Sequence, residues 1–240
     1  MNSSTVSIAL ITGASRGLGL TLARALGGRG WHLLMDGRNG EALEAARREL
    51  AEGTTVRAVR GSVAEPQHRY ALLQAAREMG GLDLVVNNAS ILGLSPRPSL
   101  LNYPLAILEE VFLVNTLAPL GVLQAVQSAL RPGARVINIT SDAGAEAYAG
   151  WGGYGASKAA LEHMSAVLAE EAPEMRVYWV DPGDMNTDMQ QEAFPGEDIS
   201  DRLPPEDSVP GLLALIEKDY PSGRYHAHDL PEPQRASAAL

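Results

Sequence analysis

The segment that decides the fold spans residues 6–19 and reads VSIALITGASRGLG. It begins with an apolar run typical of a strand, followed by glycines at positions 13, 17 and 19 in the spacing G-x-x-x-G-x-G. A stretch of helical character then covers residues 17–29. A strand, a glycine-rich turn and a helix in direct succession predict the first βα unit of a parallel sheet.

The rest of the chain repeats this unit. Apolar runs rich in Val, Ile and Leu recur at 6–12, 31–36, 54–60, 82–87, 134–140 and 175–181. Segments of helical character lie between them at 17–29, 41–51, 66–78, 104–130 and 154–171. Strands that are apolar throughout are expected when helices cover both faces of a parallel sheet. We therefore predict an α/β fold, a Rossmann-like doubly wound parallel sheet in three layers.

No linker rich in Pro, Gly or Ser divides the chain, so we expect a single domain over residues 1–230. Two regions depart from the strand–helix rhythm. Residues 184–207 are acidic and rich in proline, and we expect them to form a substrate loop after the sixth strand. Residues 231–240 are expected to be a disordered tail.

Composition limits the classes of function. The chain has 240 residues, 45% of them hydrophobic, and its 19 basic and 29 acidic residues give a net charge of −10. We therefore expect neither nucleic acid nor a membrane surface as a partner. There is no cysteine, which suits a reducing compartment, and MNSSTVSIAL lacks the basic region and cleavage site of a signal peptide. We expect a cytoplasmic protein.

One stretch is long and apolar enough to raise the question of a membrane span. Residues 111–130 carry no charge. They also contain Asn115, Thr116 and Pro119, and the chain has no second stretch of this kind. We interpret the segment as a buried helix of a globular protein.

The glycine-rich turn has a chemical meaning. Glycine allows a tight turn and lets the backbone approach a pyrophosphate, and the following helix offers free N–H groups and its positive dipole end to phosphates. A plain βα turn without a ligand is the alternative. Its place after the first strand of an α/β chain favours a dinucleotide site.

The end of the second strand should select the dinucleotide. An acidic residue there would bind the ribose hydroxyls of NAD, whereas an arginine would accept the 2′-phosphate of NADP. Asp36 and Arg38 flank Gly37, and Arg16 adds a second guanidinium from the glycine-rich turn. We favour NADP(H) as the cofactor, with NAD(H) as the open alternative.

A second group of residues suggests acid–base chemistry. The fifth strand ends at Ser141, and a helix that opens 13 residues later carries Tyr154 and Lys158 four positions apart, on one face. An ammonium near a phenol lowers the pKa of the tyrosine, which could then exchange a proton with a carbonyl oxygen. The alternative is an ordinary tyrosine at the start of a buried helix. The chain has only two lysines, Lys158 and Lys218, so chance pairing is uncommon.

These residues resemble the short-chain dehydrogenase/reductase family, of the single-domain type, over about residues 6–228. The matching motifs occur in the family's order: Thr12–Gly19, Asn87-Asn88-Ala89, Asn115, Ser141, Tyr154 with Lys158, and Pro182-Gly183 with Thr187. The resemblance implies that Tyr154 is the catalytic acid/base and that Lys158 lowers its pKa and binds ribose. It also implies that Ser141 binds the substrate oxygen and that Asn115 holds a water of the proton relay.

The resemblance further implies a set of cofactor-binding residues. They are Gly13, Ser15, Arg16, Gly17, Leu18, Gly19, Gly37, Arg38, Ser62, Val63, Asn87, Ala89, Tyr154, Lys158, Pro182, Gly183 and Thr187. Two positions depart from the family pattern. Ser90 stands where the family has glycine, and we expect it to be tolerated. Ser62 replaces an aspartate that binds adenine, so that contact is expected to be weaker or absent.

We therefore expect an NADP(H)-dependent oxidoreductase that interconverts a ketone or aldehyde and an alcohol by hydride transfer. A catalytically silent dinucleotide sensor or scaffold is the alternative. His226 and His228 would share one face of a final strand, but without an evident third ligand we expect no metal.

The remaining expectations concern partners. Helices 104–130 and 154–171 are unusually apolar, and family resemblance implies that they pair in a homodimer or homotetramer. The apolar positions are Leu105, Leu108, Phe112, Leu161, Met164, Val167 and Leu168. In the loop, Met185, Met189 and Phe194 could contact a substrate, while its acids discourage anions. Those acids are Asp184, Asp188, Glu192, Glu197, Asp198 and Asp201. We expect a small neutral carbonyl or alcohol as substrate.

Overall fold

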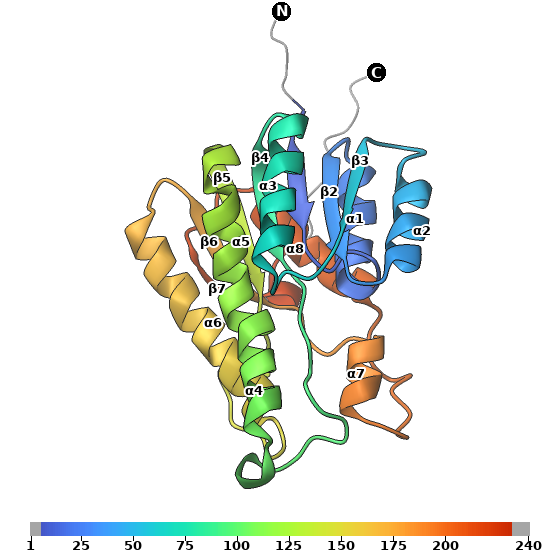
Figure 1. Cartoon of the computed structure of the whole chain (residues 1–240), viewed down its shortest axis with the longest axis vertical. Helices are drawn as coiled ribbons and strands as arrows, with labels where there is room; N and C mark the ends of the chain where they lie inside the picture. The colour runs from blue at the N-terminus through green and yellow to red at the C-terminus, as the bar shows by residue number, and fades with distance from the viewer. Residues whose placement is uncertain (1–5, 232–240) are drawn as a thin grey trace, which may run out of the picture.

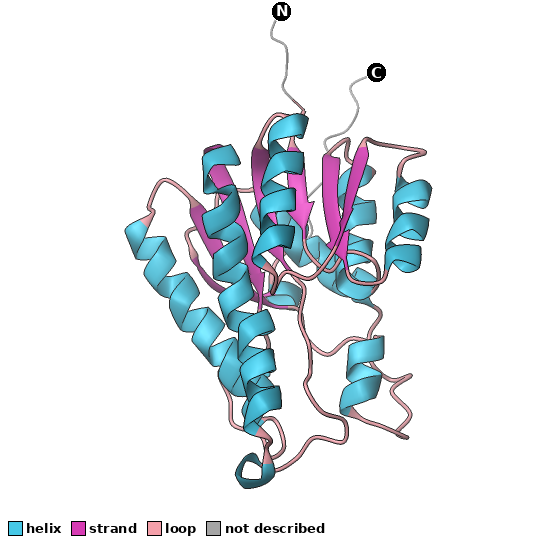
Figure 2. Ribbon diagram, in the orientation of Figure 1, coloured by secondary structure: helices cyan, strands magenta, loops and turns pink. Residues whose placement is uncertain are grey.

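The computed structural model describes residues 6–231, which form a parallel β-sheet between two layers of helices (Figures 1 and 2). The strands are β1 (Ile8–Ile11), β2 (His32–Gly37), β3 (Val56–Arg60), β4 (Leu82–Asn87), β5 (Leu130–Ile139), β6 (Arg176–Asp181) and β7 (Gly223–His226). Their order in the sheet is β3-β2-β1-β4-β5-β6-β7, and every neighbouring pair is parallel. The predicted Rossmann-like doubly wound fold is confirmed.

Alternation along the strands distributes the core between the two faces. Ala9 and Ile11 face one layer, whereas Ile8 and Leu10 face the other, because successive side chains of a strand point to opposite sides. The first layer comprises α1 (Gly17–Gly27), α2 (Gly40–Leu50) and α8 (Val209–Glu217). The second comprises α3 (Pro66–Met79), α4 (Leu105–Phe112), α5 (Ala118–Val126) and α6 (Gly152–Glu171). Strands buried on both faces explain the continuous apolar runs.

The long apolar helix is interrupted where it reaches the sheet. A π-helical turn, Leu113–Leu117, joins α4 to α5, and a short 3₁₀ turn, Gln127–Ala129, leads into β5. By length and composition alone, Leu105–Ala129 could cross a membrane. Here α5 packs against α3 and its Val122 and Val126 are buried in the core. The stretch therefore serves as a core helix, as expected from the sequence.

Residues 182–208, which follow β6, form a partly helical flap below the sheet in Figure 1. It contains α7 (Asp188–Ala193), and Met185 pairs with Leu203 in an isolated bridge that closes its base. The Ser208 hydroxyl then donates to the carbonyl oxygen of Pro182 at 2.7 Å. These contacts hold the two ends of the flap together.

The chain end differs from the sequence expectation at the two histidines. Strand β7 ends at His226, and His228 lies in the 3₁₀ turn Ala227–Asp229. The two rings therefore do not share a strand face, and that expectation was wrong. Of the predicted tail 231–240, all but Pro231 lies outside the described residues.

Candidate active site

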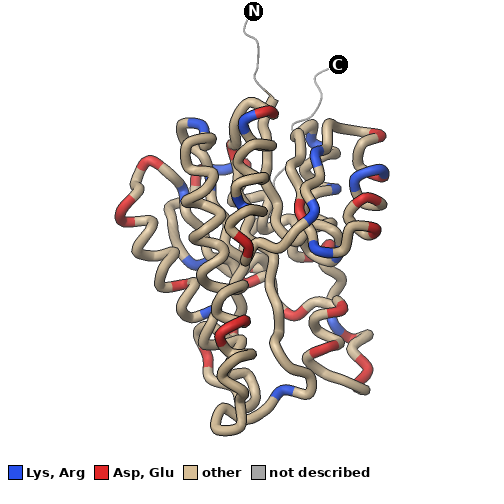
Figure 3. Tube along the Cα trace, in the orientation of Figure 1, with Lys and Arg blue, Asp and Glu red and all other residues tan. Residues whose placement is uncertain are grey.

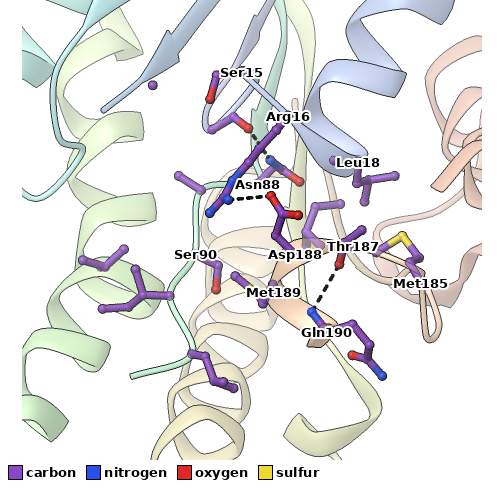
Figure 4. A pocket seen from close by; sticks show the side chains of 18 of the residues that line it. Ser15, Arg16, Leu18, Asn88, Ser90, Met185, Thr187, Asp188, Met189 and Gln190 are labelled. Atoms are coloured by element: carbon purple, nitrogen blue, oxygen red, sulfur yellow. Dashed lines mark hydrogen bonds and ion pairs between the residues drawn. The ribbon is translucent and has the colours of Figure 1, made fainter. Parts of the chain in front are cut away.

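A cleft of about 2120 Å³ runs along the carboxyl ends of the strands. This edge is where open α/β sheets bind ligands, because the strand order reverses there between β1 and β4. One end is formed by the loops after β1, β2 and β3, and the other by the start of α6 and the flap with α7. Figure 4 shows side chains of both groups, from Ser15 and Arg16 to Met189 and Gln190, facing the same space.

The glycine-rich loop is held by the loop after β4. The backbone N–H groups of Asn88 and Ala89 donate to Thr12 Oγ1, each at 3.0 Å. Asn88 Nδ2 donates to the carbonyl oxygens of Thr12 and Gly13 at 2.9 and 3.2 Å. Gly13 has φ +65°, and a Cβ there would lie 2.9 Å from Ala89 Cα, so glycine is required. Asn88, absent from the predicted set, is the side chain that joins the two loops.

Most predicted loop residues line the cleft, and two do not. Gly13, Ser15, Arg16, Gly17 and Leu18 are among the lining residues, as are Ala89, Pro182, Gly183 and Thr187. Gly19 instead packs helix α1 onto the loop, because a Cβ there would lie 2.6 Å from Asn88 Nδ2. Asn87 is 4% exposed, and its Nδ2 donates to Asn138 Oδ1 at 2.8 Å inside the sheet. The motif position that serves the loop is therefore Asn88 rather than Asn87.

The end of β2 separates the two candidate cofactor selectors. Asp36 is only 1% exposed, and its carboxylate accepts hydrogen bonds from inside the protein. Arg38 is exposed and lines the cleft together with Arg48 and Arg60. The Asp36 carboxylate is therefore engaged inside the protein, whereas Arg38 and Arg60 offer guanidinium groups to a ligand; Glu41 and Glu44 also line this end, and Glu44 pairs with Arg47 and Arg48. Ser62 and Val63 line the cleft nearby.

Tyr154 and Lys158 project from the first turns of α6, and Ser141 follows β5; all three line the cleft. Lys158 is 2% exposed, and its Nζ donates to the carbonyl oxygen of Ile139 at 2.8 Å. Burial lowers the pKa of Lys158 to about 8, because the ammonium loses water. Nζ lies 5.4 Å from the centre of the Tyr154 ring.

The phenol of Tyr154 behaves differently from the sequence expectation. Burial raises the pKa of Tyr154, and a hydrogen bond to Ser90 opposes that rise without cancelling it. Lys158 was expected to lower this pKa, but burial raises it, and the nearby charges of Asp181 and Asp142 act in the same direction. Tyr154 is therefore a neutral phenol, a proton donor, at neutral pH.

Ser141 and Asn115 already have partners. The Ser141 hydroxyl donates to Asp142 Oδ1 at 2.8 Å, so it must turn to reach a substrate. Asn115 Oδ1 accepts from Ser90 Oγ and the Ile91 N–H, while its Nδ2 donates to the Ile91 carbonyl and Ser157 Oγ. These four bonds use the hydrogen-bonding sites of the side chain, which holds the loop that carries Ser90. A relay water at Asn115 stays a prediction, and the backbone carbonyl would have to bind it.

The other end of the cleft has an aromatic and apolar lining. It includes Ile91, Leu92, Tyr148, Trp151, Met185, Met189 and Phe194. Trp151 lies edge-on to Tyr154 with 5.7 Å between ring centres, and 6.1 Å from Phe194 of the flap. Outside the cleft, the Arg97 guanidinium stacks 3.9 Å from the Trp151 ring and 4.8 Å from the Phe194 ring. Arg97 therefore joins the flap to the start of α6. No motif in the sequence indicated this contact.

The two ends also differ in charge. Figure 3 shows basic segments around the loops of β2 and β3 and mainly acidic ones around α7. Arg16 and Asp188 meet between them, with Nη1 and Oδ2 at 2.6 Å across the cleft mouth (Figure 4). Of the six acids expected to repel anionic substrates, only Asp184 and Asp188 line the cleft. Asp188 pairs with Arg16, Asp184 with Arg202 and the buried Asp181 with Arg224, so the repulsion of an anion by these acids is reduced.

The site fits a dinucleotide on its own geometry. Gly13 and Gly17 keep the backbone of the glycine-rich loop and the N-terminus of α1 accessible from the cleft, and cations stand at the far end of the cleft. A phenol, a lysine and a serine stand at the opposite end, the arrangement needed for proton exchange with a bound oxygen. Fold and site together define an α/β protein of the dinucleotide-binding class.

Comparisons with known proteins agree with this class. The sequence model for the short chain dehydrogenase family matches residues 7–198. Sepiapterin reductase of Bos taurus is 36% identical over 201 residues, covering 77% of this chain and 75% of that protein. Tropinone reductase-like 3 of Erythroxylum coca is 30% identical over 202 residues, covering 82% of this chain and 76% of that protein.

Among solved structures, a short chain dehydrogenase of Shigella flexneri in complex with NADP superimposes with a TM-score of 0.86. It is 28% identical, and the match covers 94% of this chain and 99% of that one. The chain belongs to the short-chain dehydrogenase/reductase family of oxidoreductases.

Proposed function

We propose that the protein is an NADP(H)-dependent oxidoreductase that interconverts a ketone or aldehyde and an alcohol, with Tyr154 as acid/base. The observation that carries the proposal is that the acid–base residues and the glycine-rich loop line one cleft. Ser141, Tyr154 and Lys158 line the same space as the glycine-rich loop, so a dinucleotide in that loop would extend towards the phenol. The relatives support an oxidoreductase, and the NADP complex of the Shigella protein supports the choice of dinucleotide.

The chain's own residues would hold the cofactor by charge and backbone contacts. Free N–H groups at the start of α1 would bind the pyrophosphate, and Arg38, together with Arg16 once it is released from Asp188, would bind the 2′-phosphate. The buried Asp36 favours NADP(H) over NAD(H), because it offers no free carboxylate to a ribose. Lys158 stands where it could bind the second ribose. Bound NADPH supplies a hydride to the carbonyl carbon.

The protein residues manage the proton and the oxygen. Tyr154 is protonated at neutral pH and can donate its proton to the carbonyl oxygen during reduction. The Ser141 hydroxyl, released from Asp142, would donate a hydrogen bond to the same oxygen and fix its position. In the oxidation direction the tyrosinate takes the proton back, and the nearby Lys158 ammonium stabilises that anion. A raised tyrosine pKa favours reduction at neutral pH.

The substrate would be small to medium-sized and neutral. The aromatic and methionine side chains offer apolar contacts, while Asp142, Asp181 and Asp184 line the cleft and oppose an anion. The test is NADPH oxidation, followed by absorbance, with aldehydes, diketones, quinones and 3-oxoacyl thioesters. Turnover of a neutral carbonyl compound is expected. Clear preference for carboxylated or phosphorylated ketones would reject the substrate class, and micromolar NADPH binding without any turnover would favour a sensor.

A homodimer or homotetramer is part of the proposal. Leu105 of α4 is 72% exposed and Val167 of α6 is 42% exposed, so the described surface carries apolar side chains on both expected helices. Leu161, in contrast, is buried and belongs to the core of the protomer. Light scattering at micromolar concentration should show a dimer or larger species, and a monomer would reject this part. The cytoplasmic location stays a prediction, which cell fractionation would test.

A further inference from the structure

Two buried titratable side chains take no part in the proposed reaction. Asp36 ends β2 and His68 lies on α3, and their side chains are 2% and 3% exposed. His68 Nε2 lies 3.0 Å from Asp36 Oδ2. A buried carboxylate is costly unless each oxygen has a hydrogen-bond donor, so a partner for Oδ2 is a physical requirement.

The other oxygen of Asp36 holds the glycine-rich loop. The Gly13 N–H donates to Asp36 Oδ1 at 2.7 Å, and the Ala14 N–H donates to the Asp36 carbonyl oxygen at 2.9 Å. One residue therefore fixes two successive amides of the loop. His68, by holding the opposite carboxylate oxygen, sets the angle at which Oδ1 meets Gly13.

His68 also supports the second loop of the cofactor end. Its ring rests against Gly61, where a Cβ would lie only 2.2 Å from Nδ1. Gly61 precedes Ser62 and Val63, which line the cleft. His68 thus contacts the loop after β3 and also bonds Asp36, which holds the glycine-rich loop. It thereby connects the two loops.

We propose that Asp36 and His68 are a positioning pair, which holds the glycine-rich loop and the loop after β3 in the geometry that binds the dinucleotide. The inference rests on the proposed NADP(H) binding and extends it to residues that do not touch the reacting atoms. Removing His68 leaves Oδ2 buried without a donor, so the carboxylate must turn towards water and release Gly13.

The experiment measures the NADPH dissociation constant of the full chain by fluorescence titration. His68→Leu is expected to weaken binding roughly tenfold or more, because it removes a hydrogen bond to a buried charged group. His68→Gln can still donate an N–H to Asp36, so it should lose less than about threefold. His32→Leu, at the opposite end of β2, is the matched control and should bind as wild type does.

Two further readouts separate positioning from general stability. At saturating NADPH the kcat of His68→Leu should stay within about twofold of wild type, because Tyr154 and Lys158 stand on α6. Asp36→Asn keeps an acceptor for Gly13 and can donate to His68, so it should resemble His68→Gln. If His68→Leu does not fold, His68→Asn replaces it, since the shorter amide cannot reach Oδ2 and should show the same loss.

Three results would overturn the pair. The first is that His68→Leu binds NADPH as tightly as wild type does, measured well below its melting temperature. The second is that His68→Leu and His68→Gln lose the same NADPH affinity. The third is that kcat falls by the same factor as the NADPH affinity. A wild-type protein that binds neither NADPH nor NADH would reject the proposed function instead. The two failures are therefore distinguishable.

Discussion

The two ends of the cleft are built in different ways. The cofactor end comes from consecutive βα units, and each hydrogen bond that joins the loops after β1, β2 and β4 involves a backbone N–H or carbonyl group, with Thr12, Asp36 and Asn88 as the side-chain partners. The substrate end combines the loop after β4, the start of α6 and the flap with α7, which meet through side chains such as Arg97, Trp151 and Phe194. Few side chains fix the cofactor end, whereas the side-chain contacts of the substrate end change with almost every substitution. The first end is thus suited to a constant ligand, and the second to a particular one.

The sharpest way to break this comparison is Tyr154→Phe. The change removes one hydroxyl at the substrate end and leaves the glycine-rich loop intact. Acid–base catalysis by one placed group is typically worth about 10²–10⁴-fold, so kcat should fall by that factor. The NADPH dissociation constant should change less than about threefold. Near-wild-type turnover in steady-state kinetics would contradict the role of Tyr154.

Lys158→Met tests whether burial of the Lys158 ammonium lowers the free energy of unfolding. In the folded protein the pKa of Lys158 is about 8, below its usual 10.5, so between these values the unfolded chain binds more protons. The cost of burying the Lys158 ammonium is therefore absent above pH 10.5. It grows as pH falls from 10.5 to 8 and is fully present below pH 8. A lowering of this size corresponds to roughly 3 kcal/mol, partly offset by the lost bond to Ile139.

The Met variant should consequently be more stable than wild type at pH 7, with a difference that shrinks as pH rises from about 8 to 10.5. Urea unfolding at a series of pH values measures it. Lys218→Met is the matched control, because Lys218 is the other lysine and is exposed. A difference that does not vary with pH would contradict the assigned burial cost.

Arg38→Asp alters the cofactor end alone. It replaces a partner of the 2′-phosphate by a carboxylate that repels it, so the ratio of NADPH to NADH affinity should fall roughly tenfold or more. The kcat at saturating cofactor should change little. Arg57→Asp, on β3 but outside the cleft, controls for the change of charge. A wild type that already prefers NADH would show that the interpretation of the β2 end is wrong.

Arg97→Leu should have the smallest effect, because it removes only the stacking that joins the flap to α6. A cation–π contact at a partly exposed site is worth about 0.5–2 kcal/mol. The KM of the carbonyl substrate should rise a few-fold, while the NADPH dissociation constant stays the same. Fluorescence quenching of the tryptophans would report a looser flap. An effect on NADPH binding alone would contradict the division between the two ends.

The sequence predicted the fold and the cofactor end well because both depend on local spacing. The glycines, the apolar strands and the Tyr154–Lys158 pair lie within single βα units or one helix turn. Contacts between distant segments could not be read in this way. From the sequence, Asp36 was the open alternative as a ribose ligand; in the structure its oxygens bind His68 and Gly13, which lie 32 and 23 residues away. Arg97 meets Phe194 across the fold, without any pattern in the sequence to link them.

The bond between the loops after β1 and β4 also has a consequence for the order of synthesis. The glycine-rich motif is complete when the ribosome has added residue 19, yet its supports, Asn88 and Ala89, lie 76 and 77 residues beyond Thr12. At about 5–20 residues per second, roughly 4–15 seconds pass before that support exists. Strand β1 lies in the middle of the sheet, and its second neighbour, β4, is synthesised after a similar delay. A nascent chain that carries the whole motif therefore has no dinucleotide site to fill, and the cofactor can stabilise the protein only after the central strands have come together.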